Sequence, residues 1–283
     1  MDCRELQIKS IEYRRSILSI IKHANAGHTG GSLSCVDILN VLYNRVLNIS
    51  PDNLSDPNRD RYIHSKGHSV EALYVILADK GFITHNKLET LQQYQSDLIG
   101  HPTKKVPGIE QNTGALGHGL SVAVGMAIAG KIDRLPYKVF TIMGDGELTE
   151  GSIWEAAMSA SHYQLDNLTA IIDRNGLQIT GLTENVMRLE PMAERFRSFG
   201  FSTHEVDGHD IDEMINVFDK LPFEPGKPNL IIAHTIKGKG VSFIENQVGW
   251  HHHVPNQVEY TSALEELNLA EEWLRNSAKI ISR

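Results

Sequence analysis

The stretch from Val139 to Leu177 decides the fold, and it reads VFTIMGDGELTEGSIWEAAMSASHYQLDNLTAIIDRNGL. Two apolar runs rich in strand-forming residues, 139–143 and 168–172, are separated by roughly 25 residues that contain a helical segment. Strands connected through a helix run parallel, because a crossover is needed to bring the chain back to the same end of the sheet. Asp145 and Asn175 are therefore predicted to follow adjacent parallel strands.

Polar side chains at the ends of these two strands predict a ligand site. Ligands of open parallel sheets bind in the crevice outside the carboxyl ends of the strands. Asp145 and Asn175 offer oxygen atoms, and Mg²⁺ typically takes one or two protein side chains and leaves its other positions to water and phosphate. Gly144 and Gly146 let the backbone come close, and we expect a helix directly after them whose N–H groups face an anion. Asp-Gly alone is a common turn, but its place between strand and helix favours a metal-bound diphosphate.

This pattern resembles the thiamine diphosphate signature, in which Gly-Asp-Gly is followed about thirty residues later by Asn. The resemblance implies that Asp145, Asn175 and the carbonyl oxygen of Leu177 hold Mg²⁺, or Ca²⁺ or Mn²⁺ in its place. It also implies that thiamine diphosphate is the organic cofactor.

Composition and charge limit the class of protein. The chain has 283 residues, of which 41% are hydrophobic and 22% charged, as expected for a globular protein with one large domain, residues 1–283. Its net charge of −8 and the lack of a basic stripe argue against a nucleic-acid partner. We expect a cytoplasmic protein with no membrane contact, because the sequence has neither a secretory signal nor a long apolar run. Cys3 and Cys35 are too few for a disulfide framework.

Helices and strands alternate along the rest of the chain, which predicts an α/β fold with a mainly parallel sheet covered by helices on both faces. A small-residue segment, Gly27 to Ser32, is predicted to be a loop. The expected helices span residues 5–23, 35–46, 71–80, 86–95, 120–129, 191–199, 211–221 and about 258–281, and the further strands span 61–63, 202–206 and 230–233.

Fourteen histidines are present, and several stand in glycine-containing turns or in the run from Trp250 to His253. A single histidine is most simply a hydrogen-bonded core or surface residue. A zinc site is a second alternative, but these histidines lie mostly in separate loops without the close spacing of zinc ligands. Neutral histidines gathered at one sheet edge would suit hydrogen bonding to phosphate and hydroxyl groups, or proton transfer near neutral pH.

Six loop motifs, taken in order, resemble transketolase over nearly the whole chain. They are Gly27-His28 with Gly30-Gly31-Ser32, Ser65-Lys66-Gly67-His68, Gly100-His101-Pro102, Gly114 to Gly119, Gly144 to Glu150, and Lys237-Gly238-Lys239-Gly240 through Trp250-His251. The matching part of that enzyme is its N-terminal, diphosphate-binding domain, whose fold the resemblance implies here.

The resemblance also implies how the cofactor is held. His68 and Gly146 would contact the diphosphate, and Gly114 and Leu116 would lie against the pyrimidine ring. Glu150 would belong to a buried acidic relay between two cofactor sites, although an acid in a first helical turn also stabilises the helix dipole.

For the substrate, the resemblance implies a channel lined by His28, His101 and His251. His28 and His251 would lie near the sugar hydroxyl that loses its proton during carbon–carbon cleavage. His101 would bind the hydroxyl at C1. The substrates would be sugar phosphates.

Three departures resemble the split transketolases, whose two domains are separate chains. His118 stands where many single-chain enzymes have Gln, Thr29 where many have Pro, and His251-His252-His253 replaces the more usual His-Gly. The glutamate that activates the cofactor would then lie on a C-terminal transketolase subunit, which carries the pyrimidine-binding domain. We expect an α₂β₂ complex, with this chain inactive alone.

The predicted function is transfer of a two-carbon ketol unit from a ketose phosphate to an aldose phosphate. Alternatives within the family are an unusual ketose, branched or sulfonated, and deoxyxylulose-phosphate synthesis. A silent scaffold is disfavoured by the intact Asp145, Asn175 and histidine loops. A nicotinamide enzyme on a similar sheet is disfavoured because no Gly-x-Gly-x-x-Gly motif follows an early strand.

Overall fold

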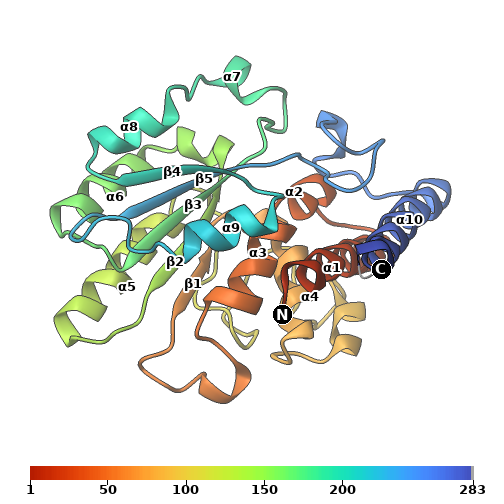
Figure 1. The fold of residues 1–283 in the computed structure, drawn as a ribbon, viewed down its shortest axis with the longest axis horizontal. Coiled ribbons are helices and arrows are strands. Elements are labelled where there is room, and N and C mark those ends of the chain that lie inside the picture. Colours follow the sequence, from red (N-terminus) through yellow and green to blue (C-terminus); the bar gives the residue numbers. More distant parts are fainter. Residues whose placement is uncertain (282–283) are drawn as a thin grey trace.

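Five parallel strands form the central sheet, in the spatial order β1-β2-β3-β5-β4 (Figure 1). The computed structural model describes residues 1–281, and the side chains of residues 1–277. The strands are β1 (Arg61–His64), β2 (Val139–Gly144), β3 (Leu168–Arg174), β4 (Ser202–Asp207) and β5 (Asn229–His234). The prediction of a parallel α/β sheet is confirmed.

The unit that contains β2 and β3 has the predicted strand–helix–strand order, with one difference. Gly144 pairs with Asp173 in the parallel register, so Asp145 and Asn175 emerge at the same edge of the sheet. The expected helix directly after Gly146 is wrong, because residues Asp145–Thr149 form a 3-10 turn and helix α6 (Gly151–His162) begins after it. Glu147 folds back to accept the Gly144 N–H at 3.2 Å, which tightens this turn.

Most other predicted helices are confirmed within a few residues at their ends. The segment expected to be helical over 86–95 is only a 3-10 segment, His85–Thr90, because Gln92 and Gln95 adopt left-handed φ angles of 56° and 64°. Among the described residues, no helix combines the length and apolar composition needed to cross a bilayer. The confirmed helices are α1 (Cys3–Ala24), α3 (Val36–Val41, continued by a π-turn Leu42–Val46), α4 (Val70–Asp79), α5 (Gly119–Asp133), α8 (Met192–Ser198), α9 (Ile211–Phe218) and α10 (Gln257–Ile281), and a short α7 spans Thr183–Val186.

The predicted loop from Gly27 to Ser32 is wrong from Thr29 onward, because Thr29–Ser34 form a buried helix, α2. Glycines are needed there for close packing rather than for a turn. A Cβ on Gly30 would lie 2.9 Å from the Trp250 carbonyl oxygen, and one on Gly31 would lie 3.4 Å from His68 Nε2. The small residues therefore bring the start of α2 against the loops that surround the sheet edge.

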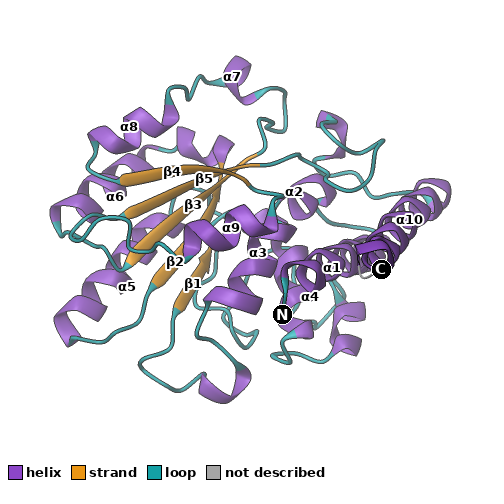
Figure 2. Ribbon diagram, viewed as in Figure 1, coloured by secondary structure: helices purple, strands orange, loops and turns teal. Residues whose placement is uncertain are grey.

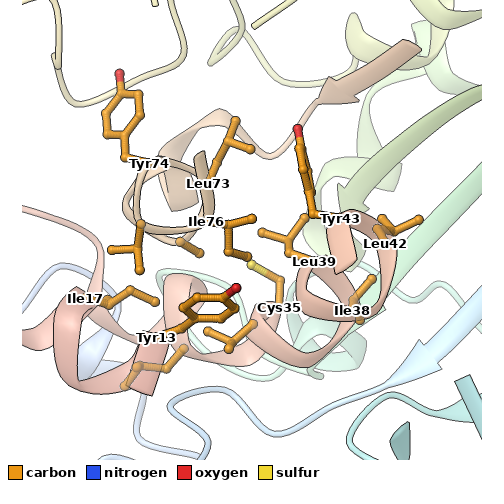
Figure 3. Packing of buried hydrophobic residues seen from close by; sticks show 14 of the residues in the cluster. Tyr13, Ile17, Cys35, Ile38, Leu39, Leu42, Tyr43, Leu73, Tyr74 and Ile76 are labelled. Atoms are coloured by element: carbon orange, nitrogen blue, oxygen red, sulfur yellow. The ribbon is translucent and has the colours of Figure 1, made fainter. Parts of the chain in front are cut away.

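Two hydrophobic layers sandwich the sheet, as the helices on its two sides in Figure 2 indicate. Helices α1, α3, α4 and α9 pack on one face and α5, α6 and α8 on the other. Along β2, Phe140 and Ile142 belong to the first layer, and Val139 and Met143 belong to the second. Figure 3 shows the first layer, where α1, α3 and α4 interlock around buried side chains such as Ile76.

Local capping explains where the first helix begins and ends. The Asp2 carboxylate accepts the Glu5 N–H at 2.8 Å, and the Glu5 carboxylate accepts the Asp2 N–H at 2.8 Å, which forms a capping box. Asn25 then ends α1 in a left-handed conformation.

Helix α10 packs along α1 (Figure 1).

Candidate active site

A cavity of about 390 Å³ opens at the carboxyl ends of β2 and β3. It collects side chains from loops that are far apart in the sequence, and it contains every predicted site residue except His101 and Glu150. Its lining consists of His28, Gly31, Lys66, His68, Gly114, Leu116, Gly144, Asp145, Gly146, Glu147, Asn175, Leu177, Gln178, Ile179, Thr180, Lys237 and His251.

Asp145 presents a buried carboxylate at this cavity. Its Oδ2 accepts hydrogen bonds from Arg174 Nη1 at 2.9 Å, the Gly176 N–H at 2.8 Å and Thr183 Oγ1 at 3.2 Å. Its Oδ1 accepts the Gly146 N–H at 2.8 Å. Burial raises the pKa of Asp145, and the hydrogen bond and charge of Arg174 oppose that rise.

Asn175 and Leu177 form a tight turn next to this carboxylate. The turn is possible because Gly176 adopts a φ of +75°, and the Gly176 N–H ties it to Asp145. Asn175 Oδ1 accepts the Leu177 N–H at 3.1 Å, and the Leu177 carbonyl oxygen accepts from Lys237 Nζ at 3.4 Å. All three residues line the same cavity, and the Leu177 carbonyl oxygen keeps a second lone pair beside its contact with Lys237.

The residues at this place fit a hard divalent cation beside an anionic group. In the part of the chain that the structure describes, no three His, Cys, Asp or Glu side chains are grouped to hold a metal, so a cation here would need the amide and carbonyl oxygens as well. Such oxygen ligands suit Mg²⁺ better than zinc. A Cβ added to Gly144 would meet open space, so the backbone itself borders the cavity.

Two buried lysines, Lys66 and Lys237, line the cavity, and among the described residues Lys237 has no carboxylate partner, so its charge suits an anion. Lys66 forms a fully buried ion pair with Asp173, whose pKa is lowered by Lys66 and by hydrogen bonds from neighbouring hydroxyls against the effect of burial. Burial lowers the pKa of Lys237 to about 8. Sequence reasoning assigned neither lysine a role, although both stand next to glycine in the quoted motifs and a buried lysine is rare without a partner.

Histidines from three loops gather around His28 at the mouth of the site. The His28 ring centroid lies 5.4 Å from that of His68, 6.2 Å from His101, 5.5 Å from His251 and 4.4 Å from His252. Burial and the nearby His252 and His101 lower the pKa of His28 to about 4, so the ring is neutral at pH 7. Among the described residues, its buried Nδ1 has no hydrogen-bond partner. The hydrogen-bonding capacity of this nitrogen is therefore unused within the described part of the chain.

Lys237 fixes the tautomer of His251. Lys237 Nζ lies 2.8 Å from His251 Nδ1, and burial followed by the charge of Lys237 lowers the pKa of His251 to about 3. An ammonium group can only donate, so Nδ1 accepts and the ring proton lies on Nε2. The protonated nitrogen can thus serve as a hydrogen-bond donor.

Two predicted site residues do not line the cavity: His101 lies beside it, and Glu150 lies on the surface. His101 borders the histidine cluster and packs on Gly114, where a Cβ would come within 2.4 Å of its ring. Glu150 is exposed at the start of α6. The buried acid of this motif is Glu147, which sequence reasoning missed: it accepts the Gly117 N–H at 2.9 Å, and burial raises its pKa.

Glu71 supports the His28 segment from behind. The side chain is fully buried at the start of α4, and it accepts the His28 N–H at 3.2 Å and Ser32 Oγ at 2.8 Å. Burial raises the pKa of Glu71 to about 7. The carboxyl group of Glu71 therefore holds the His28 backbone just before α2 and the Ser32 side chain within α2.

Comparison with known protein families identifies the domain. The family described as "Transketolase, thiamine diphosphate binding domain" matches residues 7–267. Among solved structures, transketolase from Campylobacter jejuni is similar over 98% of this chain, with a TM-score of 0.83 and 29% identity. The chain spans 48% of the length of that transketolase.

Two relatives of similar length are named as transketolase subunits. The apulose-4-phosphate transketolase subunit of Phocaeicola vulgatus is 50% identical over 268 residues, which cover 95% of each chain. The 6-deoxy-6-sulfo-D-fructose transketolase subunit SqwG of Clostridium sp. is 41% identical over 264 residues, which cover 93% of this chain and 96% of the relative. By its family match, its fold and these relatives, the chain belongs to the transketolase family and comprises that family's thiamine diphosphate-binding domain.

Proposed function

We propose that this chain is the N-terminal, diphosphate-binding subunit of a two-chain transketolase that transfers a two-carbon ketol unit from a ketose phosphate to an aldose phosphate. The observation that carries the proposal is the single cavity in which Asp145, Asn175 and the Leu177 carbonyl adjoin His28 and His251. We further propose that residues 1–283 form one domain.

The cavity floor is proposed to hold thiamine diphosphate through a divalent cation. Asp145, Asn175 and the Leu177 carbonyl would bind Mg²⁺, or Ca²⁺ or Mn²⁺ in its place. His68 and Gly146 would contact the diphosphate, whose negative charge suits the buried Lys237 ammonium. Thiamine diphosphate, when bound, supplies the stabilised carbanion chemistry that ketol transfer needs.

At the pyrimidine side, Gly114 and Leu116 would lie against the ring, since both line the cavity. Glu150 is proposed to join an acidic relay across the assembled enzyme. Its exposure in this chain is consistent with a partner that covers it.

The histidine cluster is proposed to handle the sugar. His28 and His251 are neutral at pH 7. His28 would take or share the hydroxyl proton, His251 would donate a hydrogen bond through Nε2, and His101 would bind the C1 hydroxyl.

The partner is proposed to be a C-terminal transketolase subunit with the pyrimidine-binding domain and the activating glutamate, in an α₂β₂ complex. Apolar side chains at the cavity rim support a partner surface: Ile179 lines the cavity and is 68% exposed, and Leu182 and Met187 of the same segment are 55% and 58% exposed. Figure 1 shows this segment, with α7, at the outer edge of the molecule.

A second candidate is the same reaction on an unusual ketose. The exposed His252 ring lies 4.4 Å from the His28 ring, at a position where a His-Gly sequence would have no side chain. The two relatives described above carry apulose-4-phosphate and 6-deoxy-6-sulfo-D-fructose in their names. A branched or sulfonated donor is therefore the alternative to xylulose 5-phosphate.

The test is reconstitution. The chain is mixed with the product of its neighbouring gene, thiamine diphosphate and Mg²⁺, and ketol transfer is measured with xylulose 5-phosphate, apulose 4-phosphate and 6-deoxy-6-sulfofructose as donors. We expect transfer in the mixture and none with either chain alone. Turnover by the single chain at an unchanged rate would contradict the two-chain proposal, and activity with only one donor would decide between the two candidates.

A further inference from the structure

Arg174 joins the proposed metal carboxylate to a segment that lies beside the cavity. It is the last residue of β3, and its guanidinium contacts three carboxylates: Nη1 lies 2.9 Å from Asp145 Oδ2, and Nη2 lies 2.8 Å from Glu184 Oε1 and 3.0 Å from Glu190 Oε1. Asp145 belongs to the cavity floor, whereas the two glutamates belong to the segment after Leu177. One side chain therefore contacts both parts.

This contact leaves the two oxygens of Asp145 in different states. Oδ2 is saturated by the guanidinium, an amide and a hydroxyl. Oδ1 receives only the Gly146 N–H among the described residues and keeps a lone pair for a cation. Because a guanidinium is planar and directional, it fixes the carboxylate plane in a way that a flexible ammonium would not.

The same guanidinium organises the segment from Leu177 to Glu190. Glu184, held by Arg174, accepts the backbone N–H groups of Leu189 and Glu190 at 3.3 and 3.4 Å. At the other end of the segment, residues 177–180 line the cavity. Three carboxylates against one guanidinium also leave the cluster net negative, which favours a cation nearby.

We propose that Arg174 is a positioning residue that couples occupancy of the cation site at Asp145 to the order of residues 182–190. The proposal rests on the proposed function, because it assigns a regulation to the same site. When a cation fixes Asp145, the guanidinium and both glutamates are fixed with it. Conversely, loosening of the segment would release the Asp145 carboxylate.

The test compares Arg174→Met with a matched control, Arg188→Met, which removes the same charge from an exposed side chain in the same segment. Backbone amide hydrogen exchange is measured in the complex with the partner chain, with and without thiamine diphosphate and Mg²⁺. Cation affinity is measured by calorimetry on the same samples.

In the wild type and the control, we expect the ligands to slow exchange at residues 177–180 and at residues 182–190. In Arg174→Met, slowing should persist at 177–180 and be lost at 182–190, while Mg²⁺ affinity falls by about 10–100-fold, as for other residues that orient metal ligands. Arg174→Lys should restore only part of the coupling. A purely structural role would instead speed exchange equally with and without ligands.

Two results would overturn the inference: equal Mg²⁺ affinity in Arg174→Met and wild type, or unchanged ligand-induced slowing at residues 182–190. Failure of the wild type to bind thiamine diphosphate at all is a different result, which would refute the proposed function and the inference with it.

Discussion

The ammonium of Lys66 and the carboxylate of Asp173 form an ion pair inside the cavity wall, with side-chain exposures of 1% and 0%. Asp173 also accepts hydrogen bonds from Ser34 and Thr235, so its charge is surrounded by donors. A buried pair of this kind contributes little net stability, but removal of one partner leaves a charge without compensation.

We therefore expect Lys66→Met or Asp173→Leu alone to lower the free energy of unfolding by about 3–5 kcal/mol. The double variant should lose clearly less than the sum of the two, because neither charge is then left unpaired. Urea denaturation of the four proteins measures this, and additive losses would show that the two groups do not depend on each other.

Glu71 predicts a pH dependence of stability. Its pKa is about 7 in the folded chain and about 4.5 in the unfolded chain, so the folded state holds more protons between these values. Stability from this group is present below about pH 4.5 and is lost as pH rises toward 7, by roughly 3 kcal/mol in total.

The Glu71→Gln variant has no proton to lose at this position. The melting temperature of the variant minus that of the wild type should therefore increase as the pH is raised from 5 to 8. Scanning calorimetry across this range measures the difference. A difference independent of pH would place the Glu71 pKa outside the range. Glu89→Gln, which changes an exposed glutamate, is the control.

His28 is expected to contribute to proton transfer rather than to cofactor binding. His28→Ala should lower kcat/KM for ketol transfer by roughly 100-fold or more and leave thiamine diphosphate affinity within about twofold. On the reconstituted enzyme, steady-state kinetics measures the effect on kcat/KM and calorimetry measures the effect on thiamine diphosphate affinity. His162→Ala, which changes an exposed histidine on α6, should leave both values unchanged. A loss of cofactor affinity as large as the loss of rate would contradict the assignment.

The rim residues Ile179 and Met187 are expected to bind the partner chain. Because burying such a side chain contributes about 1.5–3 kcal/mol, Ile179→Asp with Met187→Asp should weaken association at least tenfold. Analytical ultracentrifugation of the mixed chains measures this, with circular dichroism as the check on folding. Tyr94→Asp, at a position that is 92% exposed and lies between α4 and α5 in the sequence, is the control. Equal weakening by all variants would mean that the rim has no special role.

The sheet and most of the cavity were predictable from local sequence. Apolar runs of strand length, each followed by a polar residue and glycine, place Asp145 and Asn175 at one edge whatever the details of packing. Periodic apolar positions likewise predict α1 and the helical segment 35–46 nearly to their ends.

What the sequence did not predict depends on contacts between distant segments. Helix α2 exists because Gly30 and Gly31 pack against Trp250 and His68, which local propensity cannot indicate. The burial of Lys66 and Glu147 depends on partners that are distant in sequence, Asp173 and Ser65 respectively. Arg174 has no motif of its own, and its role emerges only from its three carboxylate contacts.

Metal-dependent binding of thiamine diphosphate tests the central claim most directly. Calorimetry is done on the chain with its partner for three proteins: wild type, Asp145→Asn and Asp52→Asn, a control at an exposed site. With Mg²⁺ present, wild type and Asp52→Asn should bind thiamine diphosphate saturably. Binding should disappear with EDTA, and it should weaken by at least about 10–100-fold in Asp145→Asn. Equal affinity in Asp145→Asn, or binding that EDTA does not change, would contradict a cation and diphosphate site at the ends of β2 and β3.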